Sequence, residues 1–377
     1  MAAFEFEARL RAELREAAER ECERSALARF MAAARSLAPT IGPSALPVAI
    51  GTATVVLIAV AAIALISLSE HGEVAAPKVV AHLTVGDTLG SPVAAYGSVW
   101  VSDKSRDALL RIDPGTRAVT ARLPVRGYVT LAAGAGALWA LQEGPPGKPL
   151  HREGSGQRLR GPLLRIDPNR NQVTARIELR TPQGQRITGF RVLAGDDDVW
   201  VTSPEGALRI DPQTNTVTKA ISSPTRFIGG DFALTPDGLW ARTADQRLLR
   251  YDRSTGALLG SVRLGLRQTG DAPLLAKLGD GLAASVPGGL TRVDPHTGRV
   301  LWRRVLDQRL SGWTELGGLI WARSSGGKRE RLSALDPGTG RILTSIDLDD
   351  FGGSGVAAID NELWLTTVGG SVEILRP

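Results

Sequence analysis

Few residues in this sequence have the type and spacing that catalysis requires. Histidine, the commonest metal ligand and a frequent general base, occurs only as His71, His82, His151 and His296, which are far apart along the chain. The single cysteine, Cys22, allows neither an intramolecular disulfide nor a cysteine-based zinc site. The motifs G-x-S-x-G and H-E-x-x-H do not occur. The sequence therefore favours a protein without catalytic residues, metal site or cofactor.

Two arrangements could still bind a metal ion. His151 lies between Glu143 and Glu153, and these side chains could form a metal site or an acid–base pair. Two carboxylate runs, Asp196–Asp198 and "IDLDDFGG" from Ile346, offer oxygen ligands of the kind that Ca²⁺ prefers. Neither run has the spacing of an EF-hand loop, so we expect surface turns at both.

Positive charge is the chemistry that the sequence supplies in quantity. The chain has 45 Lys and Arg against 39 Asp and Glu, a formal net charge of +6. Two polar segments, residues 142–162 and 323–333, hold a local excess of basic residues. The candidate partner-binding residues in them are Lys148, Arg152, Arg158, Arg160, Arg323, Lys328, Arg329 and Arg331.

Such a cluster attracts an anionic partner. Outside a cell, this partner would be an acidic protein patch or an anionic cell-envelope polymer, and the aromatic spacing resembles no nucleic-acid module. The alternative is a solvated surface that reflects a general preference of this sequence for arginine, because it contains 39 Arg and only 6 Lys.

The two basic segments interrupt a repeat that organises most of the chain. Six units have a tryptophan in a short apolar run, and one copy, "DGLAASV" around Ala283, has lost it. The run is followed by a phrase such as "LRIDPGTRAVTARL". The repeated tryptophans are Trp100, Trp139, Trp200, Trp240, Trp321 and Trp364. The aspartates of the phrase are Asp113, Asp167, Asp211, Asp252, Asp294 and Asp336, with successive gaps of 54, 44, 41, 42 and 42 residues. A period just above about 40 residues, built of short β segments, is typical of propeller blades.

Each unit predicts four strands, which we letter a to d. In residues 91–124 they are "SPVAAY", "SVWVSD", "ALLRID" and "AVTARLP". Asp followed by Pro and then Gly, Asn or Thr is turn chemistry, so we interpret the phrase as the c–d hairpin and its aspartate as structural. The tryptophan recurs at one strand position, which favours packing between blades over ligand binding.

The last unit ends at "SVEILRP", which aligns with strand c, and lacks a strand d. The segment "KVVAHLTVG" from Lys78 resembles a strand d without a blade. Pairing the two would close a ring of seven blades and remove the unpaired edges.

The paired patterns G-x-[VL]-W-[VA] and [LI]-R-[IV]-D-P-x-T resemble the seven-bladed propellers of the YVTN, NHL and virginiamycin B lyase-like groups. The resemblance covers residues 78–377 and implies an all-β fold. A lyase-like activity would imply a metal and a histidine in the central region, where none of the four histidines is expected. One segment, "GRVLWRR" from Gly298, resembles quinoprotein repeats without their full pattern.

Blade topology assigns the connections to two faces. The a–b and c–d turns are uniformly short and share one face, which we call the turn face. The b–c and d–a connections vary in length and share the other, the loop-rich face. Both basic segments are predicted as b–c loops, in blades 2 and 6. Insertions in a repeat fold usually mark the binding face.

The part before residue 78 predicts a membrane anchor. Residues 46–68 are mostly apolar and would form a helix roughly 34 Å long, enough to span a bilayer core of about 30 Å. Seven arginines precede this span, and the first Lys after it is Lys78, so the N-terminus should be cytoplasmic and the propeller extracytoplasmic. Residues 69–77 would be a linker.

Residues 1–45 predict a cytoplasmic amphipathic helical arm followed by a proline-containing linker. The arm is either a solvated continuation of the span or a docking helix for a partner. The leading hypothesis is a single-pass membrane protein that displays a non-enzymatic propeller for extracytoplasmic binding, as a sensor or scaffold. The alternatives are a metal-dependent lyase or hydrolase on the same fold, and transmembrane signalling through the arm.

Overall fold

The computed structural model describes residues 74–377, except for residues 128, 143–160, 186, 188, 190, 223–226, 246, 264–274, 280, 287–288, 298, 307–308, 327–328, 349–352 and 354. The predicted arm, membrane span and most of the linker lie outside the described residues. Within the described part, no helix has the length and apolar character to cross a membrane. All its regular elements are β-strands.

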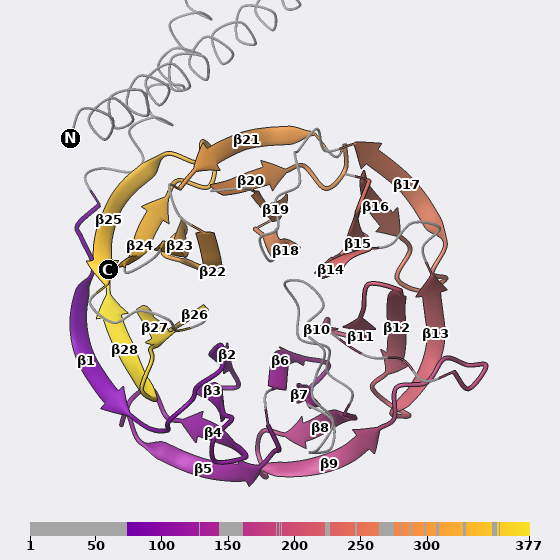
Figure 1. Cartoon of the computed structure of the whole chain (residues 1–377), viewed down its shortest axis with the longest axis horizontal. Helices are drawn as coiled ribbons and strands as arrows, with labels where there is room; N and C mark the ends of the chain where they lie inside the picture. The colour runs from indigo at the N-terminus through magenta and orange to yellow at the C-terminus, as the bar shows by residue number, and fades with distance from the viewer. Residues whose placement is uncertain are drawn as a thin grey trace, which may run out of the picture. The chain divides into compact units, whose positions relative to one another are not determined.

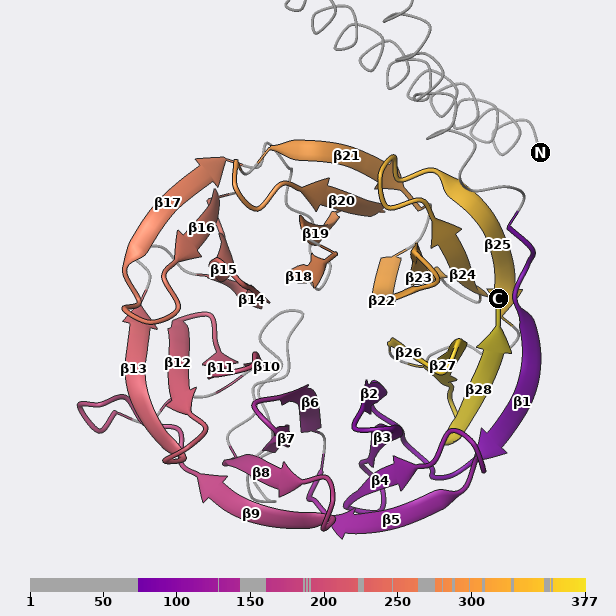
Figure 2. The same ribbon diagram turned by 180° about the vertical axis from the view of Figure 1, so that it is seen from behind.

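These strands form seven antiparallel four-stranded sheets arranged as the blades of a ring (Figures 1 and 2). Strands a to d of each blade run from the centre outward. Blades 1 and 2 are β2 (Val93–Ala95), β3 (Ser98–Asp103), β4 (Ala108–Ile112), β5 (Val119–Pro124), and β6 (Val129–Gly134), β7 (Ala137–Gln142), β8 (Leu163–Asp167), β9 (Gln172–Ile177). Blades 3 and 4 are β10 (Arg191–Ala194), β11 (Val199–Thr202), β12 (Gly206–Asp211), β13 (Thr216–Ser222), and β14 (Phe227–Thr235), β15 (Gly238–Thr243), β16 (Arg247–Tyr251), β17 (Leu258–Arg263). Blades 5 and 6 are β18 (Leu275–Leu278), β19 (Gly281–Val286), β20 (Gly289–Val293), β21 (Val300–Val305), and β22 (Arg309–Leu316), β23 (Leu319–Gly326), β24 (Arg329–Leu335), β25 (Ile342–Leu348).

Blade 7 combines the two ends of the described chain. Its sheet has the order β1 (Lys78–Thr84), β28 (Ser371–Arg376), β27 (Glu362–Thr366) and β26 (Val356–Ile359). The antiparallel register runs from Lys78 opposite Arg376 to Thr84 opposite Ser371. The predicted seven-bladed ring, closed by a strand from the N-terminal side, is therefore confirmed.

The core consists of layers between neighbouring blades. The strand-b tryptophan of one blade packs against strands b and c of the next; Trp100, for example, shares a buried cluster with Leu138 and Ile166 of blade 2. All six repeated indole rings are buried. Since a buried aromatic side chain removes a large apolar area from water, the six layers that contain such a tryptophan depend on it. Blade 5 has Ala283 at this position.

The repeated phrase folds into the c–d turn for a local reason. In blade 1, the Asp113 carboxylate accepts hydrogen bonds from the Thr116 backbone N–H at 2.7 Å and the Thr116 hydroxyl at 2.8 Å. The other five turn aspartates likewise accept backbone N–H bonds within their turns. The turn then closes through a left-handed residue, with φ of 58° at Arg117 and 71° at Gly256.

The arginine of the repeated phrase links adjacent blades at the turn face. Arg111 lies over the Trp100 ring, 5.4 Å from its centroid, and donates to the Pro168 carbonyl of blade 2 at 2.8 Å. Arg165 repeats the arrangement over Trp139 in the next blade. The repeated phrase therefore forms a turn, and its arginine forms a hydrogen bond to the c–d turn of the next blade.

Candidate functional site

The loop-rich face is where the blades differ most. Blade 3 joins strands b and c through Ser203–Glu205 alone, whereas in blade 2 the same connection runs from the end of β7 to the start of β8 at Leu163. The d–a connection from β1 of blade 7 to β2 of blade 1 has its own anchor, Asp103. This fully buried carboxylate accepts the backbone N–H groups of Asp87 and Thr88 at 3.2 and 3.3 Å.

This connection runs from the outer strand of blade 7 to the innermost strand of blade 1. Asp87 in this connection also forms an ion pair with Arg106 at 3.0 Å. A buried carboxylate that accepts two backbone N–H groups fixes the path of this loop.

Most of the predicted partner-binding residues are not placed by the structure. Lys148, Arg152, Arg158, Arg160 and Lys328 lie outside the described residues. Their contribution to the loop-rich face stays a prediction. Three of the eight residues can be located, and they differ in their surroundings.

Arg323 does not present its charge at the surface. Its side chain is fully buried, and Nε donates to the Glu330 carboxylate at 2.7 Å. Nη1 donates to the main-chain oxygens of Thr366 at 2.7 Å and Gly355 at 3.1 Å. The segment predicted as the blade 6 loop, residues 323–333, instead continues strands β23 and β24. The ion pair between Arg323 and Glu330 crosses this hairpin, and it explains why such a polar segment forms two paired strands.

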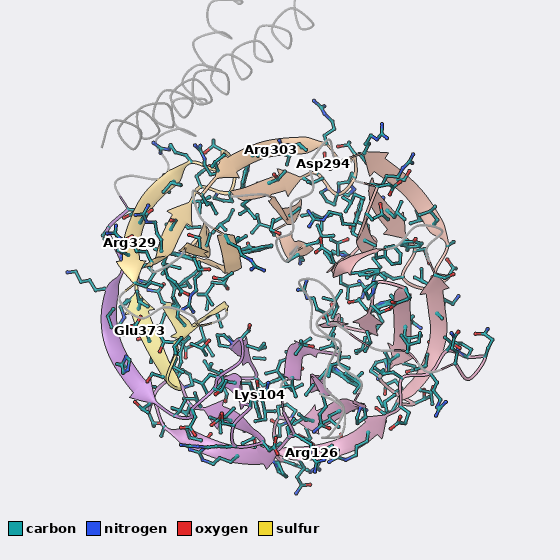
Figure 3. The ribbon with its side chains drawn as sticks, in the orientation of Figure 1. Lys104, Arg126, Asp294, Arg303, Arg329 and Glu373 are labelled. Carbon is teal, nitrogen blue, oxygen red and sulfur yellow. The ribbon has the colours of Figure 1, made fainter. Side chains whose placement is uncertain are left out.

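Arg331 and Arg329 lie further along the same hairpin. Arg331 Nε donates to Asp347 Oδ1 of β25 at 2.9 Å, and this bond holds the pKa of Asp347 below its ordinary value. Arg329 is exposed at the start of β24 (Figure 3). Of the three located residues, Arg329 therefore has the charge most accessible to a partner.

Sequence reasoning missed a second buried ion pair. Arg242 of β15 lies 2.7 Å, Nε to Oδ2, from Asp231 of β14, and both side chains are buried. Nη1 of Arg242 also donates to the Ser285 carbonyl of blade 5 at 2.9 Å. Burial raises the pKa of Asp231, against the opposing effect of the Arg242 charge. The available signal was the repeated triplet Trp-Ala-Arg, present in both blades 4 and 6.

The residues considered for catalysis do not come together. His82 lies on the outer strand β1, and His296 lies on the turn face, with Nδ1 3.4 Å from Asp237 Oδ2. His71 and His151 are outside the described residues. Across the described ranges, no group of three or more His, Cys, Asp or Glu residues could hold a metal ion.

The carboxylate run at 196–198 does not form an oxygen-lined ion site either. Asp198 is buried, where it accepts the Trp200 indole N–H at 2.8 Å and pairs with Arg253. The expected surface turn is therefore wrong for this one carboxylate. Arg253 stands where the other turns have proline, so blade 4 replaces part of the repeated phrase with an ion pair to blade 3.

Comparisons with known proteins agree with this architecture. The family described as outer membrane protein assembly factor BamB matches residues 244–350. The crystal structure of BamB from Moraxella catarrhalis has a TM-score of 0.53 and 13% identity, covering 80% of this chain and 100% of that chain. Virginiamycin B lyase from Staphylococcus aureus, solved with selenomethionine, has a TM-score of 0.62 and 14% identity with the same coverage. No curated protein matches the chain in sequence. At these identities the likeness concerns the fold alone, and the chain is an all-β seven-bladed propeller with structural neighbours in both groups.

Proposed function

We propose that this protein is a membrane-anchored, non-enzymatic binding module whose propeller recognises an anionic extracytoplasmic partner through its loop-rich face. The observation that carries the proposal is the difference between the two faces. Each of the six turn aspartates on the turn face is used by its own turn. The loop-rich face has a different set of connections in each blade, as expected of a surface adapted to a partner.

Rigid support for this face comes from its buried charges. Arg323 and Glu330 hold the end of blade 6 against blade 7, and Asp103 fixes the loop into blade 1. Because buried, fully bonded side chains do not reorganise on binding, the exposed residues above them are held in place. A preformed surface of this kind suits recognition of a partner.

Exposed positive charges supply the attraction. In addition to Arg329 of blade 6, two basic side chains are exposed on the described part of the loop-rich face: Lys104 in the b–c connection of blade 1 and Arg126 after β5. Figure 3 marks the places of all three residues on the ring. The partner would be an acidic protein patch or an anionic cell-envelope polymer. The predicted span at 46–68 would hold the propeller at the outer side of a membrane, where such partners occur.

Charge reversal tests the proposal. The full-length chain would be titrated with two probes, poly(glycerol phosphate) and poly-L-glutamate, at low and at physiological salt. We expect the triple variant K104E/R126E/R329E to weaken binding to at least one probe, and added salt to weaken binding of the unmodified protein.

A matched triple variant supplies the control. Arg122, Arg176 and Arg341 are exposed on the outer strands β5 and β9 and at the turn face, so R122E/R176E/R341E makes the same charge change away from the loop-rich face. Equal loss of binding in the two triple variants would mean that net charge, rather than this face, governs recognition. Binding that resists salt and both variants would refute an electrostatic partner site.

A further inference from the structure

Among the described residues, the outer strands of blades 4 and 5 expose more large apolar side chains than any other outer strand; β1 of blade 7 exposes Val79 alone. Five large apolar side chains on β17 and β21 are exposed: Leu258 at 54%, Leu259 at 53%, Val300 at 38%, Leu301 at 41% and Val305 at 59%. We call these five residues the rim strip. Figures 1 and 2 both show β17 and β21 following one another along the outer edge of the ring.

The repeat shows that the rim strip is a local departure. Every strand d from blade 1 to blade 6 has a register shift near its start, and the extra residue there is Thr120 in blade 1. The Thr120 hydroxyl donates to the Arg111 carbonyl at 3.4 Å, and blades 2 and 3 repeat this bond. In blades 4 and 5 the residue is Leu259 or Leu301, whose side chain is apolar and exposed.

The neighbouring position differs as well. Val119 of blade 1 and Val217 of blade 3 are partly buried and pack against the layer between two blades. Their counterparts, Leu258 and Val300, are exposed. Each of these two blades therefore places two consecutive apolar side chains at its outer edge. Contiguous exposed apolar residues on a soluble domain mark a site for a partner.

Charge around the rim strip indicates what kind of partner fits. Residues 257–263 and 299–305 contain four arginines and no carboxylate. Arg299 and Arg303 flank Val300 and Leu301 on β21, and Arg303 lies at the outer rim (Figure 3). A second copy of the chain would bring arginines against arginines, so self-association through this strip is disfavoured.

We propose that the rim strip binds an extended segment of a partner protein in which apolar side chains alternate with carboxylates. Side chains on one face of an extended segment recur about every 6.6–7 Å, which suits a row of apolar and basic residues along a strand. The register shift at Leu259 and Leu301 interrupts the regular ladder, so recognition rests on the side chains as much as on the strand edge. This surface is separate from the loop-rich face.

The experiment uses the full-length chain and a labelled peptide of alternating valine and glutamate, followed by fluorescence anisotropy. The variant L259T/L301T introduces the residue that blades 1–3 have at this position, with a carbonyl acceptor in reach, so it should fold normally. We expect it to weaken peptide binding by at least about tenfold, because the two leucines lose most of their buried apolar area.

The arginines of the outer strands allow an independent test of the proposal with two single variants. R303E should weaken binding, whereas R122E, the same change at the same repeat position of blade 1, should not. A peptide with lysine in place of glutamate should not bind. Binding unaffected by L259T/L301T, or no saturable binding up to about 1 mM peptide, would overturn the proposal.

Two further measurements would show whether the rim strip binds a second copy of the chain or a lipid surface in place of an acidic segment. Sedimentation velocity that shows a dimer dispersed by L259T/L301T would replace the acidic segment with a second copy of the chain. Co-sedimentation with phosphatidylcholine–phosphatidylglycerol vesicles that is lost in L259T/L301T would replace it with a lipid surface, and would be measured on protein from which residues 1–77 had been removed after the propeller had been shown to fold without them.

Discussion

Arg242 and Arg323 occupy the same position in two different blades, two residues after the strand-b tryptophan. Each donates from Nη1 to the main-chain oxygen of the equivalent position in the next blade, Ser285 at 2.9 Å and Thr366 at 2.7 Å. Each is also paired with a buried carboxylate of its own blade. These arginines therefore join one blade to the next on the loop-rich side, as Arg111 does at the turn face.

Removing one member of such a pair should be costly. The variant R323M leaves the Glu330 carboxylate buried without its partner, and we expect it to lower the free energy of unfolding by about 3–5 kcal/mol. Urea unfolding measures this loss. The double variant R323M/E330L should recover much of it, because no charge then stays unpaired. As a control, R331M removes an exposed pair and should change stability by at most about 1 kcal/mol.

Two tryptophans should differ in their tolerance of phenylalanine. The Trp139 indole N–H donates to the Gly134 carbonyl at 3.0 Å, whereas Nε1 of Trp364 has no hydrogen-bond partner among the described residues. Both rings are fully buried. We expect W139F to cost about 0.5–1.5 kcal/mol more than W364F in thermal or urea unfolding, the net value of one hydrogen bond. Equal losses would show that packing alone decides both sites.

The lowered pKa of the turn aspartate Asp113 predicts how the stability of the protein depends on pH. Hydrogen bonds from Thr116 hold the pKa of Asp113 below its ordinary value. Because the pKa is lower in the folded chain, the stabilisation is present above the unfolded pKa of about 3.9 and is lost as the pH falls through the folded pKa. D113N should therefore be less stable than the unmodified protein at neutral pH, and the difference should shrink in acid. Unfolding midpoints that differ equally at all pH values would contradict this.

Closure of the ring depends on β1. Deleting residues 78–84 leaves β28 with an open edge and removes a set of ladder hydrogen bonds worth about 0.5–1.5 kcal/mol each. We expect a lower melting temperature and faster proteolysis of blade 7. H82A, a change at an exposed side chain of the same strand, should leave both nearly unchanged.

The predicted topology can be tested in intact cells. A tag placed before Phe4 should be protected from added protease, while a tag at the C-terminus should be accessible, because the arginine-rich side of a span faces the cytoplasm. Permeabilised cells supply the control, since both tags should then be cleaved. An N-terminal tag that is digested in intact cells would reverse the proposed orientation.

The ring could be predicted from the sequence because its signals are local and periodic. The turn around Asp113 needs only its own residues, and the unpaired "SVEILRP" points directly to a strand elsewhere in the chain. The blade 6 hairpin could not be predicted, since Arg323 and Glu330 replace the apolar alternation that identifies a strand. Their mutual bond compensates for the charge, and such a pairing depends on the register of two strands.

The candidate binding surface was harder to predict for the same reason. Arg323 belongs by sequence to a basic segment, but its location is set by Glu330 and by carbonyl groups of the next blade. The rim strip was missed because Leu259 and Leu301 fit the apolar pattern of a strand. Their exposure depends on the packing of the whole blade, which periodicity does not report.

The pairing of β1 with β28 also sets an order of events during synthesis. β1 ends at Thr84 and its partner begins at Ser371, so β1 leaves the ribosome long before β28 exists. At about 5–20 residues per second, the interval is roughly 15–60 s. For that time β1 must remain without its partner strand while blades 1 to 6 form. A nascent chain of this protein therefore carries an open strand edge until β28 has been made, and its yield in the cell should depend on factors that shield that edge.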